Sequence, residues 1–79
     1  MDKEPTTLVE MQRGQSGTVL QLKGGHGLVK RLNALGILPG KKITKVSSML
    51  MRGPVTISVD RVHIAIGFGM ARKIIVRAD

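Results

Sequence analysis

The sequence predicts a small, mainly β barrel that contains one short helix. Three observations lead to this prediction. About five short apolar runs alternate with polar residues at a spacing of about 8–12 residues. Only one segment has helical spacing, and Gly and Pro separate the runs. The 79 residues, of which 42% are apolar, suffice for one domain covering 1–79 and show no repeat or linker.

The first expected elements are a short strand or pre-strand and a longer strand, joined by a turn. We expect residues 1–5 to be frayed and residues 8–11 to form the first element. Residues 14–17 have the composition of a turn. Residues 18–23 are rich in strand-favouring types, although Val19 falls among the outward positions of a regular alternation.

A helix over about residues 27–36 is predicted next. Its apolar stripe consists of leucines that recur at i, i+4 and i+7: Leu28, Leu32 and Leu35. Gly36 is expected to be a left-handed residue that ends the helix, and the Pro-Gly pair at 39–40 prevents its continuation.

From residue 41 onward every expected element is a strand. Residues 42–46 do not alternate cleanly, because Ile43 and Val46 cannot share one face of a regular strand; a bulge or a bent edge strand would resolve the conflict. Residues 55–59 show the clearest alternation of the chain.

The remaining residues predict a hairpin and a closing strand. Asp60 and Arg61 form the expected tight connection to a second inward stripe, which consists of Val62, Ile64 and Ile66. Residues 67–71 are expected to form a compact turn, and residues 74–76 the last strand.

Composition limits the class of function. Thirteen Lys and Arg against five Asp and Glu give a net charge of +8, which fits anionic partners such as nucleic acid, phospholipid headgroups or an acidic protein surface. With 1% aromatic residues, base stacking on aromatic rings is disfavoured. Because no apolar run exceeds three residues and cysteine is absent, we expect a cytoplasmic protein without a membrane span or disulfide.

No residue pattern predicts catalysis, a cofactor or a metal site. The two histidines, His26 and His63, have no partner at metal-ligand spacing, and no serine or threonine lies in a nucleophile motif. Residues 24–27 (Gly-Gly-His-Gly) open the helix, but their spacing matches no phosphate-binding motif, and a flexible strand-to-helix turn explains the glycines without any ligand.

A contact surface is the more specific expectation. Met49, Leu50 and Met51 lie between two strands, where they form either a core flap or a partner-docking loop. Basic residues lie around this loop and the helix, and they either steer a partner or keep the domain soluble. The candidate partner-binding residues are Met49, Leu50, Met51, Arg52, Lys41, Lys42, Lys45, Lys30 and Arg31.

Three motifs give the chain a family resemblance. Residues 31–40 read Arg-Leu-x-x-Leu-Gly-Ile-x-Pro-Gly, residues 53–55 read Gly-Pro-Val, and residues 71–76 read Ala-x-x-Ile-x-Val. From about Thr7 to Val76 the chain resembles the FeoA family. The resemblance implies an SH3-like barrel of five strands with an inserted helix, of the type also found at the C-terminus of iron-dependent repressors related to the diphtheria toxin repressor.

The resemblance further implies a small cytoplasmic accessory protein of ferrous iron uptake. Its implied partner is FeoB, a membrane transporter with a cytosolic G-protein domain. Family membership implies transition-metal ion binding in a broad sense, but it supplies no catalytic or metal-ligating residue to transfer. A nucleic-acid-binding barrel is the alternative function, an enzyme subunit is a third, and self-association through strand edges stays open.

Overall fold

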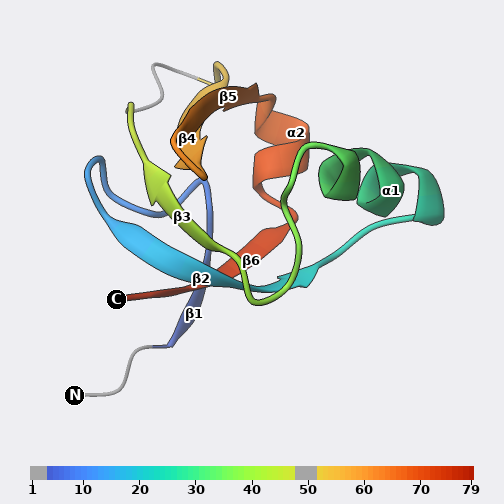
Figure 1. The fold of residues 1–79 in the computed structure, drawn as a ribbon, viewed down its shortest axis with the longest axis horizontal. Helices are drawn as coiled ribbons and strands as arrows, with labels where there is room; N and C mark the ends of the chain where they lie inside the picture. The colour runs from blue at the N-terminus through green and yellow to red at the C-terminus, as the bar shows by residue number, and fades with distance from the viewer. Residues whose placement is uncertain (1–3, 48–51) are drawn as a thin grey trace.

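A computed structural model describes residues 4–47 and 52–79, which form one six-stranded antiparallel sheet and two short helices (Figure 1). In chain order the elements are β1 (Pro5–Thr7), β2 (Ser16–Leu22), α1 (His26–Ala34), β3 (Lys42–Lys45), β4 (Val55–Val59), β5 (Val62–Ile66), α2 (Phe68–Ala71) and β6 (Ile74–Ala78). The strands are ordered β1-β6-β2-β3-β4-β5.

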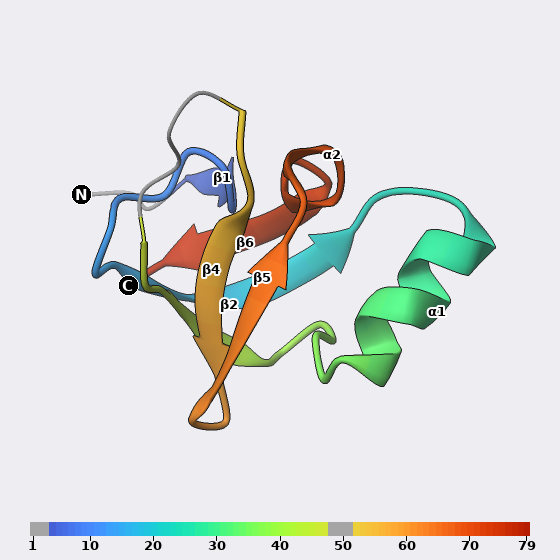
Figure 2. The ribbon, with the colours of Figure 1, turned by 90° about the horizontal axis from the view of Figure 1, so that it is seen from above.

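The predicted fold class, a mainly β SH3-like barrel with a helix after the second strand, is confirmed, with β1 and the one-turn α2 as additions. Figures 1 and 2 place α1 at one end of the molecule and both chain termini toward the other. None of the helices among the described residues is long and apolar enough to span a bilayer.

Aliphatic side chains from every strand except β1 fill the core of the barrel. The predicted alternation of β4 is confirmed: Val55, Ile57 and Val59 are buried, while the two residues between them are half-buried. Burial of such side chains is the main favourable term in folding. The remaining buried apolar residues are Leu8, Met11, Val19, Leu32, Ile37, Ile43, Ile66, Ala71, Ile74 and Val76.

The chain before β2 differs from the prediction in its local structure. Pro5, expected in a frayed end, pairs with Arg77 as part of β1. Residues 8–11 form a helical turn instead of a strand, because the backbone N–H groups of Glu10 and Met11 both donate to the carbonyl of Thr7, at 3.1 and 3.2 Å. Leu8 is nevertheless fully buried, so the turn still contributes to the core.

Strand β2 starts earlier than predicted, and the positions that point into the core are the opposite ones. Gly17, assigned to the turn, lies within the strand and is buried, and Val19 is buried rather than outward. The pairing of β2 with β6 shifts in register between Val19 and Gln21, which marks an irregularity of the β-bulge type. At the end of the segment 42–46, where the sequence predicted an irregularity, the N–H groups of Val46 and Ser47 both donate to the carbonyl of Thr56, at 2.8 and 3.4 Å.

Strand β3 is a central strand, between β2 and β4, and its inward positions are Ile43 and Lys45. Its alternation was hidden in the sequence because one inward residue is a lysine. Lys45 is only 3% exposed. Its Nζ donates to the carbonyl oxygens of Val9 at 2.9 Å and Met11 at 2.6 Å. Burial lowers the pKa of the Lys45 amine from its usual 10.5, because desolvation disfavours the charged form.

The helix α1 ends at Ala34, two residues before the predicted end at about 36, and it packs differently. Gly36 has φ +90°, which confirms the left-handed residue that follows the helix. Of the three leucines in the predicted stripe, only Leu32 is fully buried, and Leu35 is 40% exposed. The stripe ends one turn early because Leu35 is already the cap residue, outside the regular helix.

The hairpin of β4 and β5 has the predicted two-residue turn. Asp60 and Arg61 both have positive φ, 51° and 69°, as the type I′ turn requires. The inward stripe predicted for β5 is only partly confirmed. Ile66 is buried, Ile64 is half-buried, and Val62 is 58% exposed.

Replacement of Gly17 by alanine is expected to destabilise the fold. A Cβ at this position would lie 2.7 Å from the backbone oxygen of Arg77 on β6. The expected loss is about 1–3 kcal/mol in the free energy of unfolding, measured by chemical denaturation. Gly69→Ala is the matched control, since a Cβ there meets nothing within 4 Å; an equal loss in both variants would contradict the close approach of β2 and β6.

Replacement of Lys45 by methionine should cost about 2–4 kcal/mol in unfolding free energy, because two buried carbonyls lose their donor. Lys42→Met, on the same strand, removes only an exposed ion pair with Asp79 and should cost less than about 1 kcal/mol. Comparable losses in the two variants would contradict the structural role of the Lys45 amine.

The difference in stability between the wild type and Lys45→Met should depend on pH. Because the folded-state pKa of Lys45 lies below 10.5, the unfolded chain binds more protons between these two values. The stability of the wild type relative to Lys45→Met should therefore rise with pH in the window that ends at 10.5, and be constant below that window. A difference that falls as pH rises would show that the pKa is not lowered.

Candidate partner-binding surface

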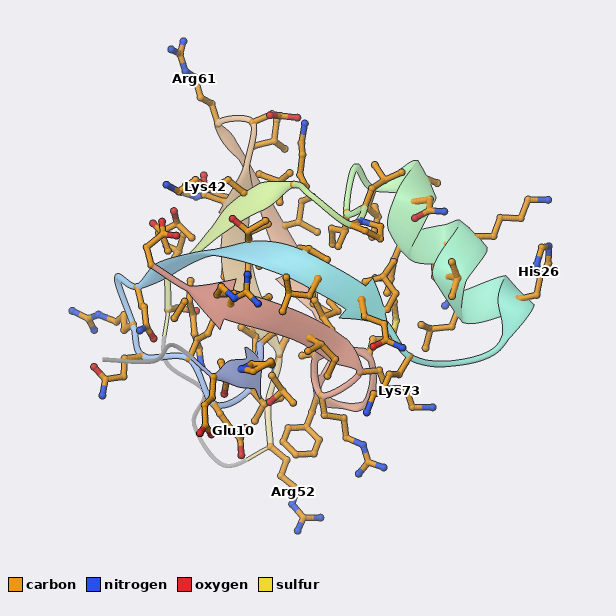
Figure 3. All side chains as sticks on the ribbon, turned by 90° about the horizontal axis from the view of Figure 1, so that it is seen from below. Glu10, His26, Lys42, Arg52, Arg61 and Lys73 are labelled. Atoms are coloured by element: carbon orange, nitrogen blue, oxygen red, sulfur yellow. The ribbon has the colours of Figure 1, made fainter. Side chains whose placement is uncertain are left out.

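The residues predicted to bind a partner are distributed over the molecule instead of forming one patch. Met49, Leu50 and Met51 lie outside the described residues. Arg52 is exposed, with its guanidinium carbon 5.8 Å from the centre of the Phe68 ring. Figure 3 shows Arg52 at one end of the barrel and Arg61, the turn residue of the β4–β5 hairpin, at the opposite end.

Lys45 has to be removed from the predicted contact surface. Its side chain is buried and its amine is directed at backbone carbonyls, so it offers no charge to a partner. A lysine on a strand is usually exposed. The one available signal was the failed alternation of residues 42–46, which an inward Lys45 explains.

The other predicted cations are exposed to different degrees. Lys41 pairs with Asp60 at 2.6 Å, and Lys42 pairs with Asp79 at 2.7 Å. Both pairs are partly open to solvent, so they contribute little stability but offset part of the local charge. Lys30 and Arg31 are exposed on α1, and neither takes part in an ion pair between described residues.

An exposed apolar surface, which the sequence analysis missed, lies at the hairpin end of the barrel. It consists of Leu35, Leu38 and Val62, which are 40%, 42% and 58% exposed. Leu38 belonged to no predicted element, although its position beyond Gly36, in a segment of turn residues, was a usable signal. Val62 had been assigned to the core stripe of β5.

Two contacts place the helix end and the hairpin together. A Cβ built on Gly36 would lie 3.9 Å from Cγ1 of Val59, which pairs with Val62. The ion pair of Lys41 and Asp60 connects the residue before β3 to the turn of the same hairpin. The segment that follows α1 therefore lies near the hairpin turn, and these elements also carry the cations Arg31, Lys41 and Arg61.

The described surface is suited to contact rather than to enclosing a small ligand. It contains no pocket, and residues 4–47 and 52–79 contain no group of three or more His, Cys, Asp and Glu side chains placed to share a metal ion. His26 and His63 are exposed on different elements, α1 and β5. Gly25 precedes α1 with no side-chain cap hydrogen bond, and a Cβ built on Gly24, at φ +143°, would lie 3.1 Å from Cδ2 of Leu28.

Solved structures share this architecture over nearly the whole chain. An iron uptake regulatory protein (FeoA) superposes with a TM-score of 0.87 and 38% identity, covering 96% of this chain and 99% of that one. A manganese-dependent transcriptional repressor gives a TM-score of 0.88 over 100% of this chain and 44% of its own, and at 16% identity this likeness shows the fold alone.

Sequence comparison identifies the family. Fe(2+) transport protein A of Methanocaldococcus jannaschii is 37% identical over 65 residues, which is 82% of this chain and 77% of that protein. The FeoA domain family matches residues 6–78, from β1 to the end of β6 and including the surface of Leu35, Leu38 and Val62. With its SH3-like barrel and these matches, the chain belongs to the FeoA family, which is associated with ferrous iron transport.

Proposed function

We propose that the protein is an accessory component of ferrous iron uptake that docks, on the cytoplasmic side of the membrane, on the cytosolic part of an FeoB-type GTP-dependent transporter. Membership of the FeoA family supports the link to iron transport. The observation that carries the docking role is the exposed apolar surface of Leu35, Leu38 and Val62 on a chain of net charge +8.

The composition of this surface fits protein docking. Removal of apolar surface from water is the main favourable term in most protein–protein association. Cations at the rim mainly steer the approach of an acidic partner and raise the association rate. Arg31 on α1 and Arg61 in the hairpin turn are exposed, and in this proposal they have this role. Lys30, which precedes Arg31 on α1 and is also exposed, adds a further cation.

The docking loop predicted at Met49–Met51 stays a separate prediction, because it lies outside the described residues. Arg52, which follows it, is exposed at the end of the barrel far from Arg61 (Figure 3). A partner that reaches both ends would have to contact one whole side of the barrel. Lys41 and Lys42 contribute less, since each already faces a carboxylate.

Nucleic-acid binding, the alternative function, is less well supported by the placement of charge. A basic stripe along one face is the usual footprint of nucleic-acid binding. Here the cations Arg52 and Arg61 lie at opposite ends, and Phe68, the one aromatic residue, is half-buried. We therefore treat oligonucleotide binding as a competing outcome in the experiment below.

Introduction of an acidic residue into the apolar surface should weaken binding to the transporter. The FeoB-type transporter of the same organism, reconstituted in nanodiscs, is immobilised and titrated with the wild-type chain, Leu38→Asp and Gln12→Asp. Leu38→Asp should raise Kd about tenfold or more, because it places an anion among apolar and cationic groups. Gln12→Asp makes the same change of charge at an exposed position outside this surface and should stay within about twofold.

Two results would contradict the proposal. Absence of wild-type binding to the transporter at moderate salt is the first. Tighter binding of a generic oligonucleotide, with a steep loss of affinity on addition of salt, is the second and would favour the nucleic-acid alternative. Equal effects of Leu38→Asp and Gln12→Asp would keep the partner but exclude the surface.

Salt should act on the association rate. Exposed charges are screened over about 8–10 Å at physiological ionic strength, whereas contacts between apolar side chains are not. Raising the salt concentration should therefore lower the association rate constant severalfold and leave the dissociation rate constant nearly unchanged, as followed by stopped-flow or interferometry. A change confined to the dissociation rate would show that the charges act within the bound interface.

A further inference from the structure

Strand β5 ends the sheet and has one free side. Among residues 4–47 and 52–79 it pairs with β4 over all five residues and with no other strand. Figure 2 shows it beside β4 as the second strand of the hairpin. Within the described residues, no further backbone hydrogen bond connects residues 62–66 to another segment.

The hairpin register determines which backbone groups face this free side. In a hairpin with a two-residue turn, the residues flanking the turn exchange both backbone hydrogen bonds, and the pattern repeats every second residue. The backbone N–H and C=O groups of Val62, which pairs with Val59, are therefore directed at β4, as are those of Ile64 and Ile66. The N–H and C=O groups of His63 and Ala65 point away from β4.

This edge lacks the features that usually prevent strands from adding to a sheet. Protective features are charged side chains, proline, bulges or a very short strand. Residues 62–66 (Val-His-Ile-Ala-Ile) contain no charged residue and no proline, and their register with β4 is regular. His63, Ala65 and Val62 are exposed.

The charged residues near the two ends of β5 indicate which kind of partner would bind there. Arg61 precedes β5, and at its other end Arg52 lies over the ring of Phe68, two residues beyond the strand. The nearest carboxylate in sequence, that of Asp60, is held by Lys41 at 2.6 Å. A second copy would bring another charge of +8 to the same edge, which opposes self-pairing.

We propose that β5 is a docking edge to which an extended acidic segment of the transporter's cytosolic part adds as a further antiparallel or parallel strand. The inference rests on the proposed function and specifies how the partner binds. The backbone groups of His63 and Ala65 supply the hydrogen bonds. Apolar side chains of the segment lie on the face of Val62 and Ile64, and its acidic residues lie near Arg61 and Arg52.

Amide hydrogen exchange tests this proposal residue by residue. In the free protein the amides of His63 and Ala65 should exchange quickly, and those of Val62, Ile64 and Ile66 slowly, because only the latter bond to β4. Addition of the reconstituted transporter should slow exchange at His63 and Ala65 by about tenfold or more and restore the pattern of a central strand.

A pair of variants at one position tests the same point by affinity. Ala65→Pro removes an outward N–H without removing a bond to β4, whereas Ala65→Val keeps the N–H and favours a strand. Transporter binding should weaken about tenfold in Ala65→Pro and change less than about threefold in Ala65→Val. Thermal unfolding checks that Ala65→Pro is folded, and if it is not, the exchange measurement on the wild type decides.

The outcomes separate the two proposals. If the wild type binds the transporter but His63 and Ala65 stay unprotected, the docking edge is wrong and the proposed function stands. If the wild type does not bind, both fall. Protection of the two amides without any partner, with a dimer in sedimentation velocity, would assign the edge to a second copy and overturn the acidic segment.

Discussion

The buried amine of Lys45 holds the segment before β2 against the centre of the sheet. Its Nζ donates to Val9 and Met11, and its backbone accepts a bond from Gly14 and donates one to Gln15. A domain of this size buries only about 60% of its unfolded surface and has no disulfide to compensate. One lysine therefore fixes a helical turn that supplies buried apolar residues, at the cost of desolvating an ammonium group.

The same small size leaves the sheet with a free edge. The six strands are ordered with β1 and β5 at the two ends, and the inward side chains of β5 become more exposed from Ile66 through Ile64 to Val62. Leu35 and Leu38, which are also exposed, lie on either side of Gly36, and Gly36 approaches Val59 of the same hairpin. Lys45 fixes the segment before β2, and β5 pairs on one side only among the described residues. The barrel can therefore present a contact surface at β5 without a change of fold.

The sequence was most informative where local chemistry decides the structure. The alternation of β4, the left-handed Gly36 and the tight turn at Asp60 all depend on residues close in sequence, and all three predictions are confirmed. Although the predicted barrel is confirmed, some predictions that depend on tertiary neighbours were wrong. An inward lysine hid the alternation of β3, and a missing neighbour strand exposed Val62, whose residue type alone indicates burial.

The candidate site was harder to predict than the fold, because a contact surface has no motif of its own. Exposed cations could be listed from the sequence, but their separation over two ends of the barrel and the burial of Lys45 follow only from the folded arrangement. Leu38 could have been found as an apolar residue in a segment of turn residues. The free backbone groups of β5 could not, since they depend on strand order.

The central claim is that this chain contacts a transporter through the hairpin end of its barrel, and site-specific photocrosslinking in cells tests it most directly. A photoreactive amino acid is placed at Leu38 in one strain and at Gln12 in another, and the crosslinked proteins are identified by mass spectrometry. The account predicts crosslinks from position 38 to the cytosolic part of the FeoB-type transporter and few or none from position 12. Crosslinks to the transporter from position 12 alone, or from position 38 only to other proteins or nucleic acid, would contradict it.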